Sequence, residues 1–406
     1  MKKVWYIFSS YWDEIIISLG AFTIFGVLLL INLSKQPPQL AAPEVSSAIA
    51  AHNLHFNNLN PINLLYNLPL HFALLIHASI GSLRVISVIY GVALLILLYI
   101  VLTYWFNSLI SAVGVALLAT SSWFLNLARV ATPDILFAFG SVVLIISCML
   151  FMHTRLRNMT FIFFLGCLAA LVYIPGFIWL VGGVLVWSSK KIFQALKRVS
   201  NYEKVIGVLL GGAILLPLVW SLRQHPELLK SFFGLPSHFV TPIMLLRNFY
   251  NIPLTLFLRA PASPLYWLGT LPLLNVIETI LFVFGIYSLY KDHRLAEPRN
   301  VFIYGILACI FLIVLGGPVT IAILLPVIYI IILVGLLYLW RLWLMVFPKN
   351  PIAMSIGLCL VVILMAVSCN YQLRRYLIAW QGSPTTSQVF SHSFPSFDTI
   401  TTSNKE

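Results

Sequence analysis

The sequence predicts an all-α polytopic membrane protein with about eleven transmembrane helices and interfacial helices in its outer loops. Of its 406 residues, 61% are hydrophobic and only 9% are charged. Apolar runs of about 18 residues or more recur along the chain, and a helix of that length crosses the ~30 Å hydrocarbon core of a bilayer. The runs are continuously apolar rather than alternating, which favours helices over the strands of a transmembrane barrel.

The basic residues indicate which ends of these helices share a compartment, because lysine and arginine concentrate in short cytoplasmic loops. Any two basic clusters must therefore be separated by an even number of crossings. The clusters lie at residues 1–3, 153–158, 188–204, 290–299 and 341–349. In a soluble protein a net charge of +13 would suggest nucleic acid. Here most basic residues flank apolar runs, so we expect anionic lipid headgroups as partners and no nucleic acid.

The apolar run from Met159 to Trp187 must cross the membrane twice, since basic clusters flank it at both ends. Pro175 and Gly176, in the sequence "YIPG", can break the helix and turn the chain back at the far side. The same reasoning divides the run at 301–340 at "GGP", residues 316–318.

The predicted topology has a cytoplasmic N-terminus and an outer C-terminus. We expect spans at 14–33, 82–103, 108–126, 133–152, 159–173, 175–188, 205–221, 266–289, 300–316, 318–339 and 351–369. Residues 1–369 then form one transmembrane module with outer loops at 34–81 and 222–265, and residues 370–406 form a short outer tail. None of these segments is long enough for a separate catalytic domain, so any chemistry takes place at the outer membrane surface.

The stretch "LARVATPDILFAFG", residues 127–140, sets two charges between long apolar runs. Thr132 as N-cap, Pro133 at the first helical position and Asp134 in the first turn would begin the next helix. Arg129 instead lies at an outer helix end, where the positive-inside rule disfavours it. It is either a clamp for a lipid-borne phosphate, oriented by Asp134, or a side chain that reaches for headgroups.

Two further residues of the outer surface are candidates for the same chemistry. Arg84 occupies the matching outer end of the second span, so a shared anionic ligand with Arg129 is one interpretation and headgroup contact is the other. Glu44 is the only acidic residue of the loop at 34–81. It begins a predicted short helix, "PEVSSAIAAHNL", where it either serves the helix dipole or accepts a proton from an acceptor hydroxyl.

The remaining polar candidates lie further along the chain. Glu278 falls within the predicted eighth span, where an ionisable residue is either functional or a hydrogen-bonding partner between helices; the structural role is favoured. Arg247 and Arg259 alternate with aromatic residues in the loop at 222–265, a pattern typical of interfacial helices. The five cysteines show no metal-ligand spacing, and the histidines of the first outer loop are best explained as interfacial, so we expect no metal and no cofactor.

Taken together, these motifs resemble the GT-C superfamily of polytopic glycosyltransferases, in particular bacterial relatives of protein O-mannosyltransferases and of the lipid A aminoarabinose transferase. The likeness lies in "PEVSSAIA", "NLPLHFALLIHASIGSLRVISVIYG" and "LARVATPDILFAF", in that order. "LAALVYIPGFIWL" is similar to the family's fifth and sixth helix pair, with Tyr173 in the turn. "YLIAWQGSPTTSQVF" resembles the closing segment of some members.

The resemblance implies transfer of a sugar from a polyprenyl-phosphate donor to a lipid, glycan or protein acceptor at the outer face of a bacterial plasma membrane. Such a reaction needs cations at the phosphate leaving group and one carboxylate to deprotonate the nucleophile. Arg84 and Arg129, with Arg247 or Arg259 closing from above, are candidates for the first task. Glu44 is the candidate for the second, because Pro43 replaces the aspartate that the family usually has as its proposed base.

Two other functions remain open at this stage. The chain could be a transporter or flippase for a lipid-linked substrate, although it shows no obvious duplication and its predicted helix breaks lie at the outer face rather than at mid-membrane. It could also be a non-catalytic protein that binds a polyprenyl lipid, an interpretation that the replacement of the aspartate by Pro43 keeps open.

Overall fold

The computed structural model describes residues 23–54, 60–153, 157–236, 241–260, 263–292, 296–315, 320–348 and 350–395, and these are almost entirely helical. The helices are α2 (Ala42–His52), α3 (Leu64–Ile76), α4 (Ile80–Trp105), α5 (Ser108–Thr120), α6 (Ser122–Arg129), α7 (Ile135–His153), α8 (Arg157–Leu171), α9 (Phe177–Trp187), α10 (Ser189–Leu196), α11 (Asn201–Gln224), α12 (Leu228–Phe232), α13 (Pro242–Pro253), α14 (Val276–Lys291), α15 (Ala296–Leu315), α16 (Leu325–Val346), α17 (Pro351–Arg374) and α18 (Pro384–Val389). Short π- or 3₁₀-helical segments occupy Leu254–Leu258, Ile321–Leu324 and Arg375–Trp380, and the strands are β1 (Leu40–Ala41) and β2 (Phe390–His392).

The all-α membrane class is confirmed, whereas the count of eleven spans is not. Among the described residues six helices are long and apolar enough to cross a membrane, or seven if one bent pair counts as a span. That pair is α5 and α6, which meet at an angle of 67°. The prediction of one continuous span at 108–126 is therefore wrong. Ser121 has an extended backbone between the two helices and ends the first of them.

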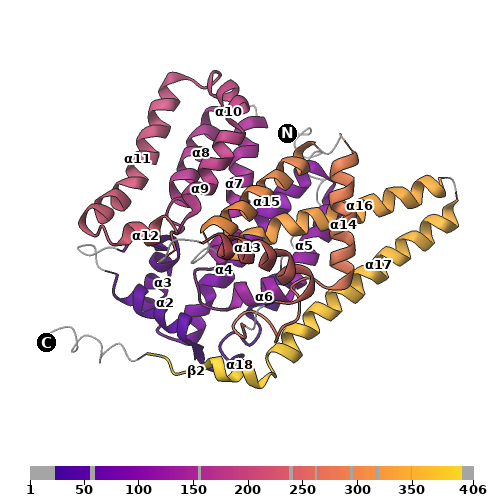
Figure 1. Cartoon of the computed structure of the whole chain (residues 1–406), viewed down its shortest axis with the longest axis horizontal. Helices are drawn as coiled ribbons and strands as arrows, with labels where there is room; N and C mark the ends of the chain where they lie inside the picture. Colours follow the sequence, from indigo (N-terminus) through magenta and orange to yellow (C-terminus); the bar gives the residue numbers. More distant parts are fainter. Residues whose placement is uncertain are drawn as a thin grey trace, which may run out of the picture.

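Two segments lie at the centre of the bundle, Ile135–Met152 of α7 and Ile321–Val346, which contains α16. In each of them 83% of an apolar 18-residue window is buried. α14 crosses α16 so closely that a methyl group on Gly335 would lie 1.8 Å from the carbonyl oxygen of Leu281. Small residues permit such backbone contact between membrane helices. By contrast only 17% of the corresponding window is buried in α11 and 11% in the segment Pro351–Trp380, so both leave apolar side chains exposed. Figure 1 shows α11 and α17 along two edges of the bundle.

The predicted helical hairpin at "YIPG" is confirmed. α8 and α9 flank this turn, and Gly176 adopts a left-handed conformation with a φ of 72°. Asn158 then contacts Glu203, which brings the basic segments at 153–158 and 188–204 together. A second contact, between Arg341 and Asp292, joins the segments at 290–299 and 341–349. The predicted turn at 316–318 lies outside the described residues.

The outer segments fold over one end of the bundle. The loop at 34–81 forms β1, α2 and α3, and the chain after α17 returns through α18 to β2, which pairs antiparallel with β1. α2, α18 and β2 lie toward the lower edge of Figure 1 with α3 just above α2, and α10 lies near the upper edge. The described part of the predicted tail, residues 370–395, therefore packs against this end of the membrane module.

The start of the predicted eighth span is also different. The chain between 264 and 275 is irregular, with prolines at positions 264 and 272 and a left-handed Gly269, and α14 begins only at Val276. Glu278 consequently lies in the first turn of α14 rather than near the middle of a span.

Candidate active site

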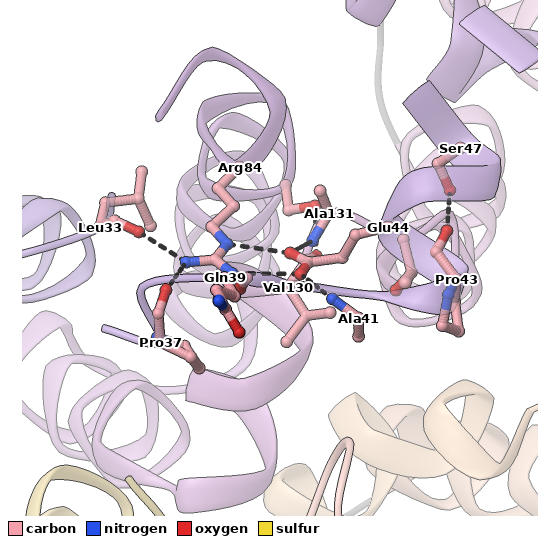
Figure 2. A network of polar contacts seen from close by, with 12 residues as sticks. Leu33, Pro37, Gln39, Ala41, Pro43, Glu44, Ser47, Arg84, Val130 and Ala131 are labelled. Carbon is pink, nitrogen blue, oxygen red and sulfur yellow. Dashed lines mark hydrogen bonds and ion pairs between the residues drawn. The ribbon is translucent and has the colours of Figure 1, made fainter. Parts of the chain in front are cut away.

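A buried ion pair between Glu44 and Arg84 organises the end of the bundle that α2 and β2 cover. Glu44 is in the first turn of α2 and Arg84 is near the start of α4, and their side chains are 0% and 1% exposed. Two bonds join them, from Nε to Oε1 over 2.9 Å and from Nη2 to Oε2 over 3.1 Å (Figure 2). A charged pair hidden from water needs such bidentate geometry to offset its desolvation.

Both members of this pair are fully engaged. Arg84 also donates to the carbonyl oxygens of Leu33, Pro37 and Gln39, so its five N–H groups are all used. The Glu44 carboxylate also accepts the backbone N–H groups of Ala41 and Ala131, at 3.0 and 2.9 Å. The pair therefore ties the first outer loop to the connection between α6 and α7.

The C-terminal segment closes over this network. Phe390 of β2 lies with its ring centroid 5.9 Å from the guanidinium carbon of Arg84. Trp380 packs edge-on against Phe390 and stacks on Tyr376, at centroid distances of 5.6 and 5.4 Å. These three aromatic side chains are 1–2% exposed and shield the arginine from solvent.

Arg129 is placed beside the same aromatic cluster and does not contact Asp134. Its guanidinium lies 5.5 Å from the ring centroid of Tyr376 and donates to the carbonyl oxygens of Leu28 and Ile31, at 3.1 and 2.6 Å. Its Nε is buried without a hydrogen-bond partner among the described residues. Arg129 thus holds the helix at residues 23–30 against α6, and Asp134 does not orient it.

A cavity of about 440 Å³ opens next to the ion-pair network. It lies between α2, the chain leading into α3, the α6–α7 connection and the irregular segment before α14. Its lining comprises Pro43, Ser46, Ser47, Ala50, Asn60, Ile62, Asn63, Asn67, Thr132, Pro133, Asp134, Leu265 and Tyr266. The described lining contains one carboxylate, several amides and hydroxyls and no cation, which suits a neutral ligand rich in hydroxyl groups.

Asp134 is the one carboxylate among the described residues that line this cavity. The helix α7 begins at Ile135, so the predicted start at Thr132 and Pro133 is too early. Asp134 accepts a hydrogen bond from the Tyr266 hydroxyl, which also lies 2.9 Å from the Thr132 hydroxyl. Burial raises the pKa of the Asp134 carboxyl above its ordinary value, and the hydrogen bond from Tyr266 opposes that rise. A half-buried carboxylate with a raised pKa in a polar cavity has the properties of a general base.

The other predicted site residues lie away from the cavity. Tyr173 donates its hydroxyl to the carbonyl of Ile214, while its own carbonyl accepts the N–H of Asn63, which lines the cavity. Glu278 accepts from Tyr329 and from Gln372, which also binds Ser122.

Arg247 lies on α13, and Arg259 follows the short helical segment at Leu254–Leu258. Both side chains are exposed, and neither is in the cavity lining.

Sequence reasoning missed Tyr266, whose hydroxyl donates a hydrogen bond to Asp134. The carbonyl oxygen of Tyr266 also accepts a hydrogen bond from the side-chain amide of Asn126, over 2.6 Å. It also missed Asn63 and Asn67 in the cavity lining. A weak signal for the asparagines is the stretch "NNLNPINLLYN", which contains five asparagines within eleven residues. No sequence pattern identifies Tyr266 as a site residue, because it lies at the start of the predicted eighth span, 266–289.

Similarity to known proteins lies in the fold. Neither family sequence profiles nor curated proteins match the chain. Among solved structures it resembles ArnT from Cupriavidus metallidurans bound to undecaprenyl phosphate, with a TM-score of 0.58 at 13% identity over 91% of this chain and 76% of that one. Apo ArnT gives a TM-score of 0.54 at 14% identity over 94% and 75% of the two chains.

The archaeal oligosaccharyltransferase AglB from Archaeoglobus fulgidus, in complex with an inhibitory peptide and a dolichol-phosphate, has a TM-score of 0.52. The identity is 13%, over 97% of this chain and 58% of AglB. ArnT, a lipid A aminoarabinose transferase, and AglB both have the GT-C fold. The chain therefore has the fold of the GT-C polytopic glycosyltransferases, as its sequence motifs predicted.

Proposed function

We propose that this protein is an integral membrane glycosyltransferase that moves a sugar from a polyprenyl-phosphate donor to an acceptor at the outer face of the membrane. The observation that carries the proposal is the polar cavity between α2 and the α6–α7 connection of a GT-C fold, with a single carboxylate among its described lining residues. Similarity to ArnT bound to undecaprenyl phosphate supports a donor of that class. A bacterial plasma membrane, with the N-terminus cytoplasmic, remains part of this proposal.

In the proposed reaction Asp134, rather than Glu44, is the general base. The acceptor hydroxyl oxygen attacks the anomeric carbon and its proton passes to the Asp134 carboxylate. The bond between the anomeric carbon and the phosphate oxygen breaks, and polyprenyl phosphate leaves with the electron pair. Glu44 has no exposed surface and accepts four hydrogen bonds, so we assign it a positioning role.

The donor phosphate needs cations outside the cavity lining. Arg84 has no free N–H, and Arg129 is buried against backbone carbonyls and Tyr376. Arg259 and Arg247 are exposed and remain the candidates. Arg259 is the stronger, because it lies seven residues before Tyr266 in the segment that borders the cavity.

The test uses purified protein in liposomes with a panel of radiolabelled undecaprenyl-phosphate sugars, measuring release of label from the donor. Asp134→Asn is expected to slow release by about 10²- to 10⁴-fold, the usual contribution of a general base. Arg259→Ala should weaken binding of undecaprenyl phosphate in native mass spectrometry, and Arg223→Ala, which removes an exposed arginine of α11, is the matched control.

A second candidate function is binding of a polyprenyl lipid without sugar transfer. One observation favours it: Pro43 lines the cavity at the position where the GT-C family usually has its proposed catalytic aspartate. It predicts tight binding of undecaprenyl phosphate and no release of label from any donor. Movement of the intact donor across the liposome membrane, without its breakdown, would instead support a transporter.

A further inference from the structure

A second cavity, of about 380 Å³, lies between α7, α9, α10 and α15. Its walls include Leu144 to Met152 of α7, Val184 and Trp187 of α9, and residues 300–307 of α15. Asp134 precedes α7, so at 1.5 Å per residue this wall begins about 15 Å further along the helix axis and extends beyond that. The two cavities thus belong to opposite ends of the bundle, as the positions of α2 and α10 show (Figure 1).

The inner surface of this second cavity is apolar and its mouth is cationic. Ile145, Met149 and Leu307 are among its aliphatic lining residues. Lys190 and Lys191 also line it, and both side chains are exposed at the start of α10. Ser188, two residues before Lys190, also lines the cavity.

From these features we propose that the cavity binds an anionic phospholipid of the surrounding membrane, with one acyl chain inside and the headgroup phosphate at Lys190 and Lys191. The charge of the mouth and the apolar wall behind it match the two parts of such a lipid. A free phosphate ion would fill only the mouth and leave the apolar cavity empty.

The proposal fits the predicted topology, since the segment at 188–204 is expected on the cytoplasmic side. A lipid held there would brace α9 and α10 against α15, far from the outer cavity. It goes beyond the proposed function, and its test measures no sugar transfer.

The experiment is native mass spectrometry of the delipidated full chain titrated with dioleoylphosphatidylglycerol or dioleoylphosphatidylcholine. A lysine near an anionic lipid contributes about 1 kcal/mol, so Lys190→Ala combined with Lys191→Ala should weaken phosphatidylglycerol binding about 25-fold. The matched control is Lys197→Ala with Arg198→Ala, which removes two exposed cations just beyond α10 and outside the lining. Its binding should stay within about threefold of the wild type.

A second variant tests the apolar part. Val184→Trp fills the cavity from α9 and should abolish binding of phosphatidylglycerol, with Met152→Trp as the substitute if the first variant does not fold. Equal affinity for the two lipids, an equal loss in the control variant, or unchanged binding in both filled variants would overturn the proposal. In the last case the lysines bind headgroups at the protein surface only.

Discussion

Replacing Glu44 by glutamine distinguishes a structural carboxylate from a catalytic one. In the wild type each carboxylate oxygen of Glu44 accepts two hydrogen bonds. The glutamine side chain keeps one acceptor oxygen and replaces the other by an NH₂ group, which cannot accept from those donors. Arg84 would remain buried with its charge uncompensated. Removing one partner of a buried pair costs about 3–5 kcal/mol. For a chain of this size we expect Tm to fall by about 3–10 °C, taking roughly 1–2 °C per kcal/mol.

The assay is thermal unfolding in detergent followed by tryptophan fluorescence, run in parallel with release of label from the sugar donor. Asp134→Asn is the matched variant, a carboxylate-to-amide change at a residue 90 positions away. Because burial raises the pKa of Asp134 in the fold, its stabilising contribution is complete below the ordinary pKa of an aspartate. That contribution is lost as the pH rises through the raised value. At neutral pH Asp134→Asn should therefore leave Tm unchanged or raise it, while transfer is lost.

The opposite pattern would refute this reasoning. A Tm shift of 1 °C corresponds to ~0.5–1 kcal/mol. If the Tm of Glu44→Gln lies within 1 °C of the wild-type value and the variant nevertheless loses transfer, then Glu44 touches the substrate. If Asp134→Asn retains transfer, the base is another group. The wild-type activity should also fall on the acid side at a pH above the ordinary aspartate pKa of about 3.9, since the base must be ionised.

Three further predictions concern contacts of the site and of the fold. Tyr266→Phe removes the hydrogen bond that holds down the pKa of Asp134, so the acid limb of the activity profile should move to higher pH; a profile identical to that of the wild type would separate Tyr266 from the base. Phe390→Ala should destabilise the protein by about 3–5 kcal/mol in thermal unfolding, because Phe390 is 2% exposed, whereas Leu377→Ala at a 38% exposed position is the control. Gly335→Ala should abolish a monodisperse folded species in size-exclusion chromatography, since the added methyl group meets the backbone of α14; a folded Ala variant would mean that α14 and α16 can separate.

Much of the architecture follows from the sequence. Continuous apolar runs and the placement of lysine and arginine predicted a helical membrane protein, and the even-crossing rule predicted the hairpin at Pro175 and Gly176 that the structure confirms. These inferences succeed because burial in lipid and the sidedness of basic loops act on local stretches of chain. The ordered motifs predicted the GT-C fold for the same reason, since each motif is short and contiguous.

Tertiary structure alone decided which polar residues meet. The sequence placed Arg84 and Arg129 at equivalent depth, but could not show that Arg84 is fully engaged by Glu44 and by carbonyl groups of residues 33–39. Nor could it bring Tyr266 to Asp134 across 132 residues, or return Phe390 to Arg84. A hydrogen bond depends on atoms within about 3 Å, and separation along the chain does not determine that distance. The sequence by itself determined the helical membrane fold, whereas three-dimensional packing decided which carboxylate faces the cavity.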